Sequence, residues 1–382
     1  MSTRPSSVPR HRNIFARSRV QRNVRRCIAA LTVGLSTACA ASSPDPVVME
    51  PMVVRAEPDP LVGLDTYDAA DLFELAAERY RAERWADAAA IYEKLVDEFP
   101  DAPEVPKAHY NAGLAHERRA AFADAARHFE AVIVRHEGSA VFGDAHFNLA
   151  RAYGKLERWE DVANTFWEAR KLEGLGPMDE LEARVGTGVG FFMQGDHFTA
   201  EREFREAVRF YEDHPKKEYL PADYFMGQSR FYLGEIIARE FEAKSLSAPD
   251  EMGTEDDWTE AMGEELESKC DLLLRAQANF IRAIREGHRG WATAAGYRIG
   301  SLYEHLFDEL MSLPVPQGLD EGAADIYREE VRDRVSILVE KAIRVYEMNR
   351  AMAERIGEDN EWVQRTTAAL ERMKALYLAT TS

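Results

Sequence analysis

Aromatic, small and aliphatic residues recur along this chain at the spacing of a helix face, and the pattern itself repeats. It reads Trp85-x-x-Ala88-x-x-x-Tyr92-x-x-Leu95, then Phe122-x-x-Ala125-x-x-x-Phe129-x-x-Val132, then Trp159-x-x-Val162-x-x-x-Phe166-x-x-Ala169. Each copy begins 37 residues after the previous one. Because residues three, four and seven apart share one face of an α-helix, each copy predicts an amphipathic helix.

A second helical segment precedes each copy and carries a small residue at an equivalent place. These small residues are Ala76, Gly113, Ala150 and Gly188, with looser counterparts at Gly234 and Gly300. A small side chain lets a neighbouring helix approach closely, and an aromatic residue of that neighbour fills the hole. One hairpin cannot bury its apolar face alone, so several must stack. The pattern predicts an all-α superhelix (α-solenoid) of about six helical hairpins with a C-terminal helical cap.

Changes in the pattern divide the chain into five predicted segments. Residues 1–39 are a signal peptide, residues 40–67 a Pro-rich linker and residues 68–215 four regular repeats. Residues 216–318 hold two looser hairpins with an acidic insertion at 245–262, and residues 319–382 hold a long helix and a cap helix. The spacing of apolar residues places the long helix at about 320–356 and the last one at about 359–378.

The N-terminal segment has the layout of an export signal. A basic stretch precedes an apolar run from Cys27 to Ala38, which is too short for a membrane-spanning helix. Leu35 to Cys39 has the form of a lipoprotein box, in which Cys39 is lipidated and becomes the new N-terminus. Ordinary cleavage at Ala38-Cys39-Ala40 is the alternative. Either route predicts an exported protein.

The offsets of small and aromatic residues in 68–215 resemble those of the tetratricopeptide repeat (TPR) family. Together with the signal segment and linker, they resemble exported bacterial TPR lipoproteins of the BamD and CpoB type. That resemblance implies a periplasmic protein anchored to the outer membrane as a lipoprotein. It also implies a concave groove, lined by the first helix of each hairpin, that binds protein partners or peptide segments.

Aligning the copies assigns candidate partner-binding residues to this groove. They are Tyr110, Asn111, Arg118, Phe147, Asn148, Arg151 and Lys155. In peptide-binding members of the family, an asparagine at the position of Asn111 and Asn148 bonds the backbone of the ligand, and an amide suits this because it both donates and accepts. The alternative is a groove filled by the chain's own C-terminal helices.

Charge and motif content narrow the range of functions. The net charge is −19, and eight arginines without any acid in residues 1–42 make the remainder more acidic still. Such a body repels nucleic acid. Residues 186–190 (GTGVG) resemble a dinucleotide loop but lie inside a predicted helix, so close helix packing is the interpretation. Five histidines cluster in the sequence and are interpreted as surface or packing residues: His109, His116, His128, His136 and His146. We expect no enzyme activity, cofactor, metal or small-molecule substrate.

These observations predict a non-enzymatic protein–protein interaction scaffold or adaptor in the bacterial cell envelope. Partner segments are expected to bind in the concave groove. The alternative is a structural subunit of an envelope machine, in gliding motility, secretion or outer-membrane assembly, that docks through its convex face or its acidic insertion.

Overall fold

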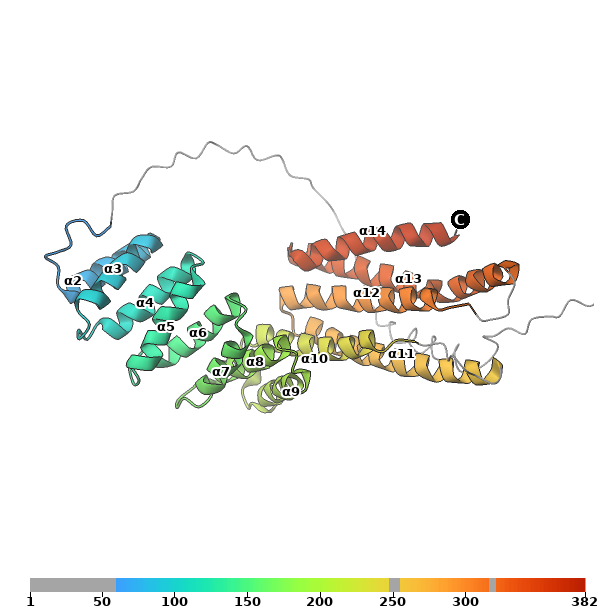
Figure 1. The fold of residues 1–382 in the computed structure, drawn as a ribbon, viewed down its shortest axis with the longest axis horizontal. Helices are drawn as coiled ribbons and strands as arrows, with labels where there is room; N and C mark the ends of the chain where they lie inside the picture. Colours follow the sequence, from blue (N-terminus) through green and yellow to red (C-terminus); the bar gives the residue numbers. More distant parts are fainter. Residues whose placement is uncertain (1–59, 247–254, 316–320, 382) are drawn as a thin grey trace, which may run out of the picture. The chain divides into compact units, whose positions relative to one another are not determined.

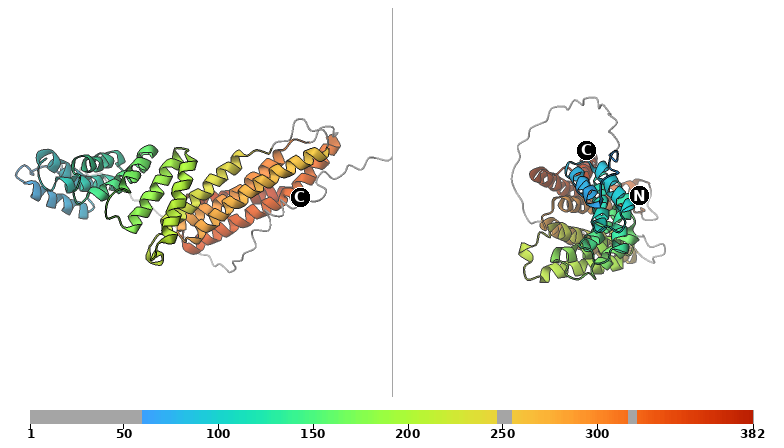
Figure 2. Two further views of the ribbon diagram at one scale, coloured as in Figure 1. Left: turned by 90° about the horizontal axis from the view of Figure 1, so that it is seen from below. Right: turned by 90° about the vertical axis from the view of Figure 1, so that its left-hand side faces the viewer.

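The computed structural model describes residues 60–246, 255–315 and 321–381, and every regular element in these ranges is a helix. The described chain divides into two compact units, residues 60–220 and residues 221–381. Consecutive helices in each unit lie side by side as antiparallel pairs (Figures 1 and 2). The all-α prediction is confirmed. No helix in the described ranges combines the length and the apolar character that a membrane span needs.

The first unit contains four helical hairpins and a short 3-10 turn. Its helices are α2 (Ala69–Arg81), α3 (Trp85–Glu98), α4 (Val105–Arg118), α5 (Phe122–Arg135), α6 (Phe142–Lys155), α7 (Trp159–Ala169), α8 (Pro177–Met193), α9 (His197–Asp213) and η1 (Lys217–Tyr219). Each hairpin packs on the next through the contact of its second helix with the first helix that follows. This arrangement is the stack that the 37-residue period predicts.

The second unit contains two longer hairpins and a final helix. Its helices are α10 (Asp223–Ala243), α11 (Glu255–Arg285), α12 (Arg289–Ser312), α13 (Glu321–Ile356) and α14 (Glu361–Thr381). Helix α11 already begins at Glu255, so part of the segment expected to be an acidic insertion is helical. Helix α14 packs against both α12 and α13.

In four of the six hairpins that the structure describes, a glycine of the first helix lies against an aromatic ring of the second. A Cβ atom built on Gly113 would lie 2.5 Å from Phe129, and one built on Gly188 would lie 2.8 Å from Phe204. In the second unit a Cβ on Gly234 would lie 2.7 Å from Phe280. These distances are shorter than any side chain tolerates, so glycine is required for the observed helix separation.

The turn between the two helices has one geometry in all four hairpins of the first unit. Glu83, Ala120 and Glu157 have φ values of 59°, 56° and 57°, and Gly195 occupies the fourth position with φ of 86°. The amide of the third residue after the end of each of these first helices bonds to the carbonyl five residues before it, as in Ala121 to His116 and Asp196 to Phe191. This is the Schellman ending of a helix, which normally favours glycine at the left-handed residue.

Replacing Gly188 with alanine will destabilise the first unit. The added methyl group meets the ring of Phe204, so the free energy of unfolding falls by about 1–3 kcal/mol, as is typical of an overpacked core. Gly143→Ala is the matched control, because its Cβ finds only Leu172 at 3.9 Å and alanine is the better helix former. Urea unfolding followed by circular dichroism measures both. Equal losses in the two variants would contradict the close-packing role of Gly188.

Candidate functional site

The candidate partner-binding residues lie on two neighbouring first helices of the first unit. Helix α4 carries Tyr110, Asn111 and Arg118, and helix α6 carries Phe147, Asn148, Arg151 and Lys155. Repeat alignment predicted these positions. The contacts of their side chains decide what each one can do.

Both asparagines are hydrogen-bonded within the chain. The Nδ2 group of Asn111 donates to the hydroxyl of Tyr92 at 3.1 Å, and that of Asn148 donates to the hydroxyl of Tyr110 at 2.9 Å. Each of these bonds joins a hairpin to the one before it. Asn148 has only 6% of its surface exposed, whereas Asn111 is half-buried. The asparagines therefore connect neighbouring hairpins, a role that alignment of single repeats does not predict.

The charges of the three basic candidates act on one carboxyl group, that of Glu117. Arg151 donates to Asn148 Oδ1 at 2.7 Å and to Glu182 Oε1 at 2.8 Å. Burial raises the pKa of Glu117, while the positive charges of Arg151, Arg118 and Lys155 oppose that rise. The face therefore carries three cations together with the carboxylates of Glu117 and Glu182, and the charge of Asp144 acts on Tyr110.

Phe147 and Arg118 differ in how far they reach solvent. Phe147 is 6% exposed and packs edge-on against Phe166 with ring centroids 6.1 Å apart, so it belongs to the core of its hairpin. The guanidinium of Arg118 is exposed and lies 5.5 Å from the centroid of the Trp85 ring. Lys155 is also exposed. Of the predicted binding residues, three are therefore charged and exposed to a partner: Arg118, Arg151 and Lys155.

Comparison with known proteins identifies the unit that repeats. Residues 66–102, which hold α2 and α3, match the sequence model of the tetratricopeptide repeat family. The match supports the TPR interpretation of the sequence pattern. The next three hairpins reproduce the turn geometry of the first one, and a glycine-to-aromatic contact closes the second and the fourth.

Two solved structures have low overall similarity to the chain. A TPR repeats protein from Bacteroides fragilis shares 13% identity, covers 63% of this chain and 99% of its own, and has a TM-score of 0.34. An assembly chaperone of RpL4 shares 12% identity, covers 83% of this chain and 100% of its own, and has a TM-score of 0.31. Neither likeness bears on function. No curated protein sequence matches the chain.

The corresponding face of the second unit is covered by the chain itself. Trp362 of α14 lies 5.7 Å from Tyr297 and 6.1 Å from Phe231, measured between ring centroids. Arg298 is held by the carboxylates of Glu235 and Glu242. The expected alternative, a groove filled by C-terminal helices, therefore describes the second unit. In the first unit, Arg118 and Lys155 are exposed.

The glycines of residues 186–190 allow close packing between helices. Gly186, Gly188 and Gly190 lie inside α8, as predicted. A Cβ on Gly190 would lie 2.7 Å from the backbone nitrogen of Ala163, and Gly186 lies directly against the Phe166 ring. Three glycines in alternation let α8 approach α7 and α9 closely, so no phosphate-binding loop exists here.

The structure describes only one of the cysteines. Cys39, the predicted lipidation site, lies outside the described residues. Cys270 is 3% exposed and packs in the core of the second unit.

We predict that Asn148→Ala lowers the free energy of unfolding by about 1–2 kcal/mol, because the Tyr110 hydroxyl and the Arg151 guanidinium both lose a partner. Lys155→Ala is the control on the same helix and should change stability by less than about 0.5 kcal/mol, because its side chain is exposed. Chemical denaturation of both variants makes the comparison. An Asn148→Ala protein as stable as the control would show that this bond does not join the hairpins.

Proposed function

We propose that this protein is a non-enzymatic scaffold of the bacterial cell envelope, and that the first-helix face of its TPR unit binds a segment of a partner protein. The proposal is carried by Arg118 and Lys155, which are exposed on neighbouring first helices and whose charges, with that of Arg151, act on Glu117. Cations placed together on an acidic chain steer and orient an oppositely charged ligand.

The chemistry of the face favours an extended segment that bears acidic side chains. Arg118 and Lys155 are exposed and can pair with carboxylates of such a segment. Asn111 is half-buried, and its bond to Tyr92 uses one of two amide protons, which leaves capacity for a ligand's backbone. Asn148 and Arg151 hold this surface in shape through Tyr110 and Glu182.

The proposed location is the periplasmic face of the outer membrane. It is supported by the basic stretch, the apolar run and the box that ends at Cys39. A diacylated Cys39 would provide the anchor, and the Pro-rich residues 40–67 would separate the TPR unit from the membrane. Ordinary cleavage beside Cys39 would instead yield a periplasmic protein without an anchor.

The groove proposal is tested by charge reversal at its exposed cations. The double variant Arg118→Glu/Lys155→Glu, expressed in the native host and crosslinked, should recover the specific partner at least about tenfold less than the parent does. Both residues are exposed, so the fold is expected to survive, and circular dichroism checks this. The readout is quantitative mass spectrometry of the proteins that copurify.

A matched control carries the same charge change on a second helix. Arg205 and Arg209 are exposed on α9, so Arg205→Glu/Arg209→Glu should leave partner recovery unchanged. If the α4/α6 variant also retains every partner, the groove is not the binding face. That result would favour the alternative function, a structural subunit of an envelope machine that docks through its convex face or the segment at 245–262.

Lipidation is tested at one residue. Cys39→Ser should remove incorporation of labelled palmitate and shift the protein from the outer-membrane fraction to the soluble periplasmic fraction. Mass spectrometry of the mature N-terminal peptide identifies the processed residue directly. An unmodified N-terminus near Ala40 in the parent protein would establish ordinary cleavage and exclude the lipid anchor.

A further inference from the structure

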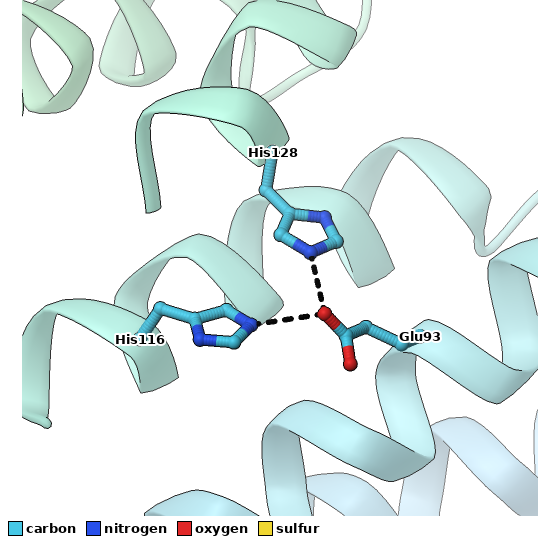
Figure 3. A group of neighbouring side chains, drawn as sticks. All are labelled: Glu93, His116 and His128. Carbon is cyan, nitrogen blue, oxygen red and sulfur yellow. Dashed lines mark hydrogen bonds and ion pairs between the residues drawn. The ribbon is translucent and has the colours of Figure 1, made fainter. Parts of the chain in front are cut away.

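Three side chains from different helices meet at one carboxylate oxygen in the first unit. They are Glu93 of α3, His116 of α4 and His128 of α5 (Figure 3). The Nε2 atoms of His116 and His128 lie 3.1 Å and 3.2 Å from Oε1 of Glu93. Both histidines are 5% exposed. Burial restricts the orientation of their rings.

A fourth side chain, His109, contacts His128 at the ring nitrogen that does not face Glu93. Nδ1 of His109 lies 3.0 Å from Nδ1 of His128. When His109 accepts the Nδ1 proton of His128, the Nε2 lone pair of His128 can coordinate a cation held between that atom and the Glu93 carboxylate.

The distances suit a divalent metal ion. Zinc binds imidazole nitrogen and carboxylate oxygen at about 2.0–2.2 Å with tetrahedral geometry, which separates the ligand atoms by about 3.3–3.5 Å. The two nitrogen–oxygen distances here are 3.1 and 3.2 Å, and all three ligand atoms lie within 4.8 Å of one another. Small side-chain rotations therefore suffice to place an ion between them.

We propose that Glu93, His116 and His128 form a zinc site that braces the first two TPR hairpins. Two neutral imidazoles and one carboxylate are a ligand set that zinc uses in proteins, with water in the fourth position. An open hollow of about 630 Å³, lined in part by Glu93, His109 and His128, provides access for the ion and that water. Nitrogen and oxygen ligands of this kind favour zinc over calcium or magnesium.

The charges around the cluster are compatible with a bound cation. Arg127 lies 3.3 Å from Glu93 but also 3.2 Å from Asp124, and its side chain is 64% exposed. When an ion arrives, Arg127 can turn to Asp124 and to solvent.

The site depends on the stacking of two repeats. Glu93 belongs to the first hairpin, while His116 and His128 belong to the second. The three ligands come together only when the two hairpins are packed, so an ion that binds them favours the packed state. His136 lies 6.0 Å from His109 between ring centroids and outside the ligand set, and His146 bonds to the carbonyl of Phe142 instead.

Calorimetric titration tests the proposal on the full chain. The protein carries Cys27→Ser and Cys39→Ser and no polyhistidine tag, so neither N-terminal thiols nor a tag can supply ligands. After the chelator has been removed, zinc chloride should bind at a single saturable site with a Kd of about 1 µM or tighter. The midpoint of thermal unfolding should rise with the free zinc concentration.

Variants assign the ligands. Glu93→Gln, His116→Gln and His128→Gln should each weaken zinc binding by at least about tenfold, and His109→Gln should weaken it by about tenfold through His128. His146→Gln is the matched control, because His146 is equally buried but lies outside the cluster. Its affinity for zinc should equal that of the parent.

A second measurement uses the parent protein, so it does not depend on whether the variants fold. Cobalt(II) added to the unaltered cluster should produce the strong visible bands of a tetrahedral site, and equimolar zinc should abolish them. Absence of saturable binding by the parent would overturn the proposal. So would an affinity in Glu93→Gln or His128→Gln equal to that of His146→Gln, because the ion would then bind elsewhere.

Discussion

The close contact between a small residue on one helix and an aromatic ring on the next is the constraint on which the rest of this structure depends. Phe129 against Gly113, Phe204 against Gly188 and Phe280 against Gly234 set the separation of the helices in their hairpins. At that separation the buried aromatic ring packs directly against the facing helix, and apolar burial of this kind is the main stabilising term in an all-α stack. A hairpin closed in this way presents one face of its first helix outward and one face of its second helix to the next repeat.

Polar contacts then fix how one hairpin sits on another. Asn111 bonds to Tyr92 and Asn148 bonds to Tyr110, and each pair spans two repeats. Such bonds add only about 1 kcal/mol each, but a half-buried hydroxyl left without a partner costs more, so they specify the register of the stack. The same register brings the charges of Arg118, Arg151 and Lys155 to act on Glu117, and that group of charges is the surface on which the proposed function rests.

Stacking also creates the histidine cluster. Glu93, His116 and His128 are far apart in the sequence and come from two hairpins, yet their ligand atoms lie within 4.8 Å of one another. The second unit uses its polar groups differently: Asn349 bonds to Thr366 and to the carbonyl of Thr293, and these bonds join α13 to α14 and α12. One unit therefore exposes a charged face, while the other covers its equivalent face with its own last helix.

The sequence by itself determined the helices, the hairpins and their period, because these follow from spacing within one or two helices. The long helix expected at about 320–356 is Glu321–Ile356, and the glycines of residues 186–190 lie inside a helix as predicted. Only the tertiary structure decided that Phe147 is core, that Asn148 is buried between repeats, and that Glu93 reaches His116 and His128. The physical reason is that these outcomes depend on the angle and offset between neighbouring hairpins. Periodicity within a hairpin fixes which residues share a face, but it leaves that angle and offset undetermined.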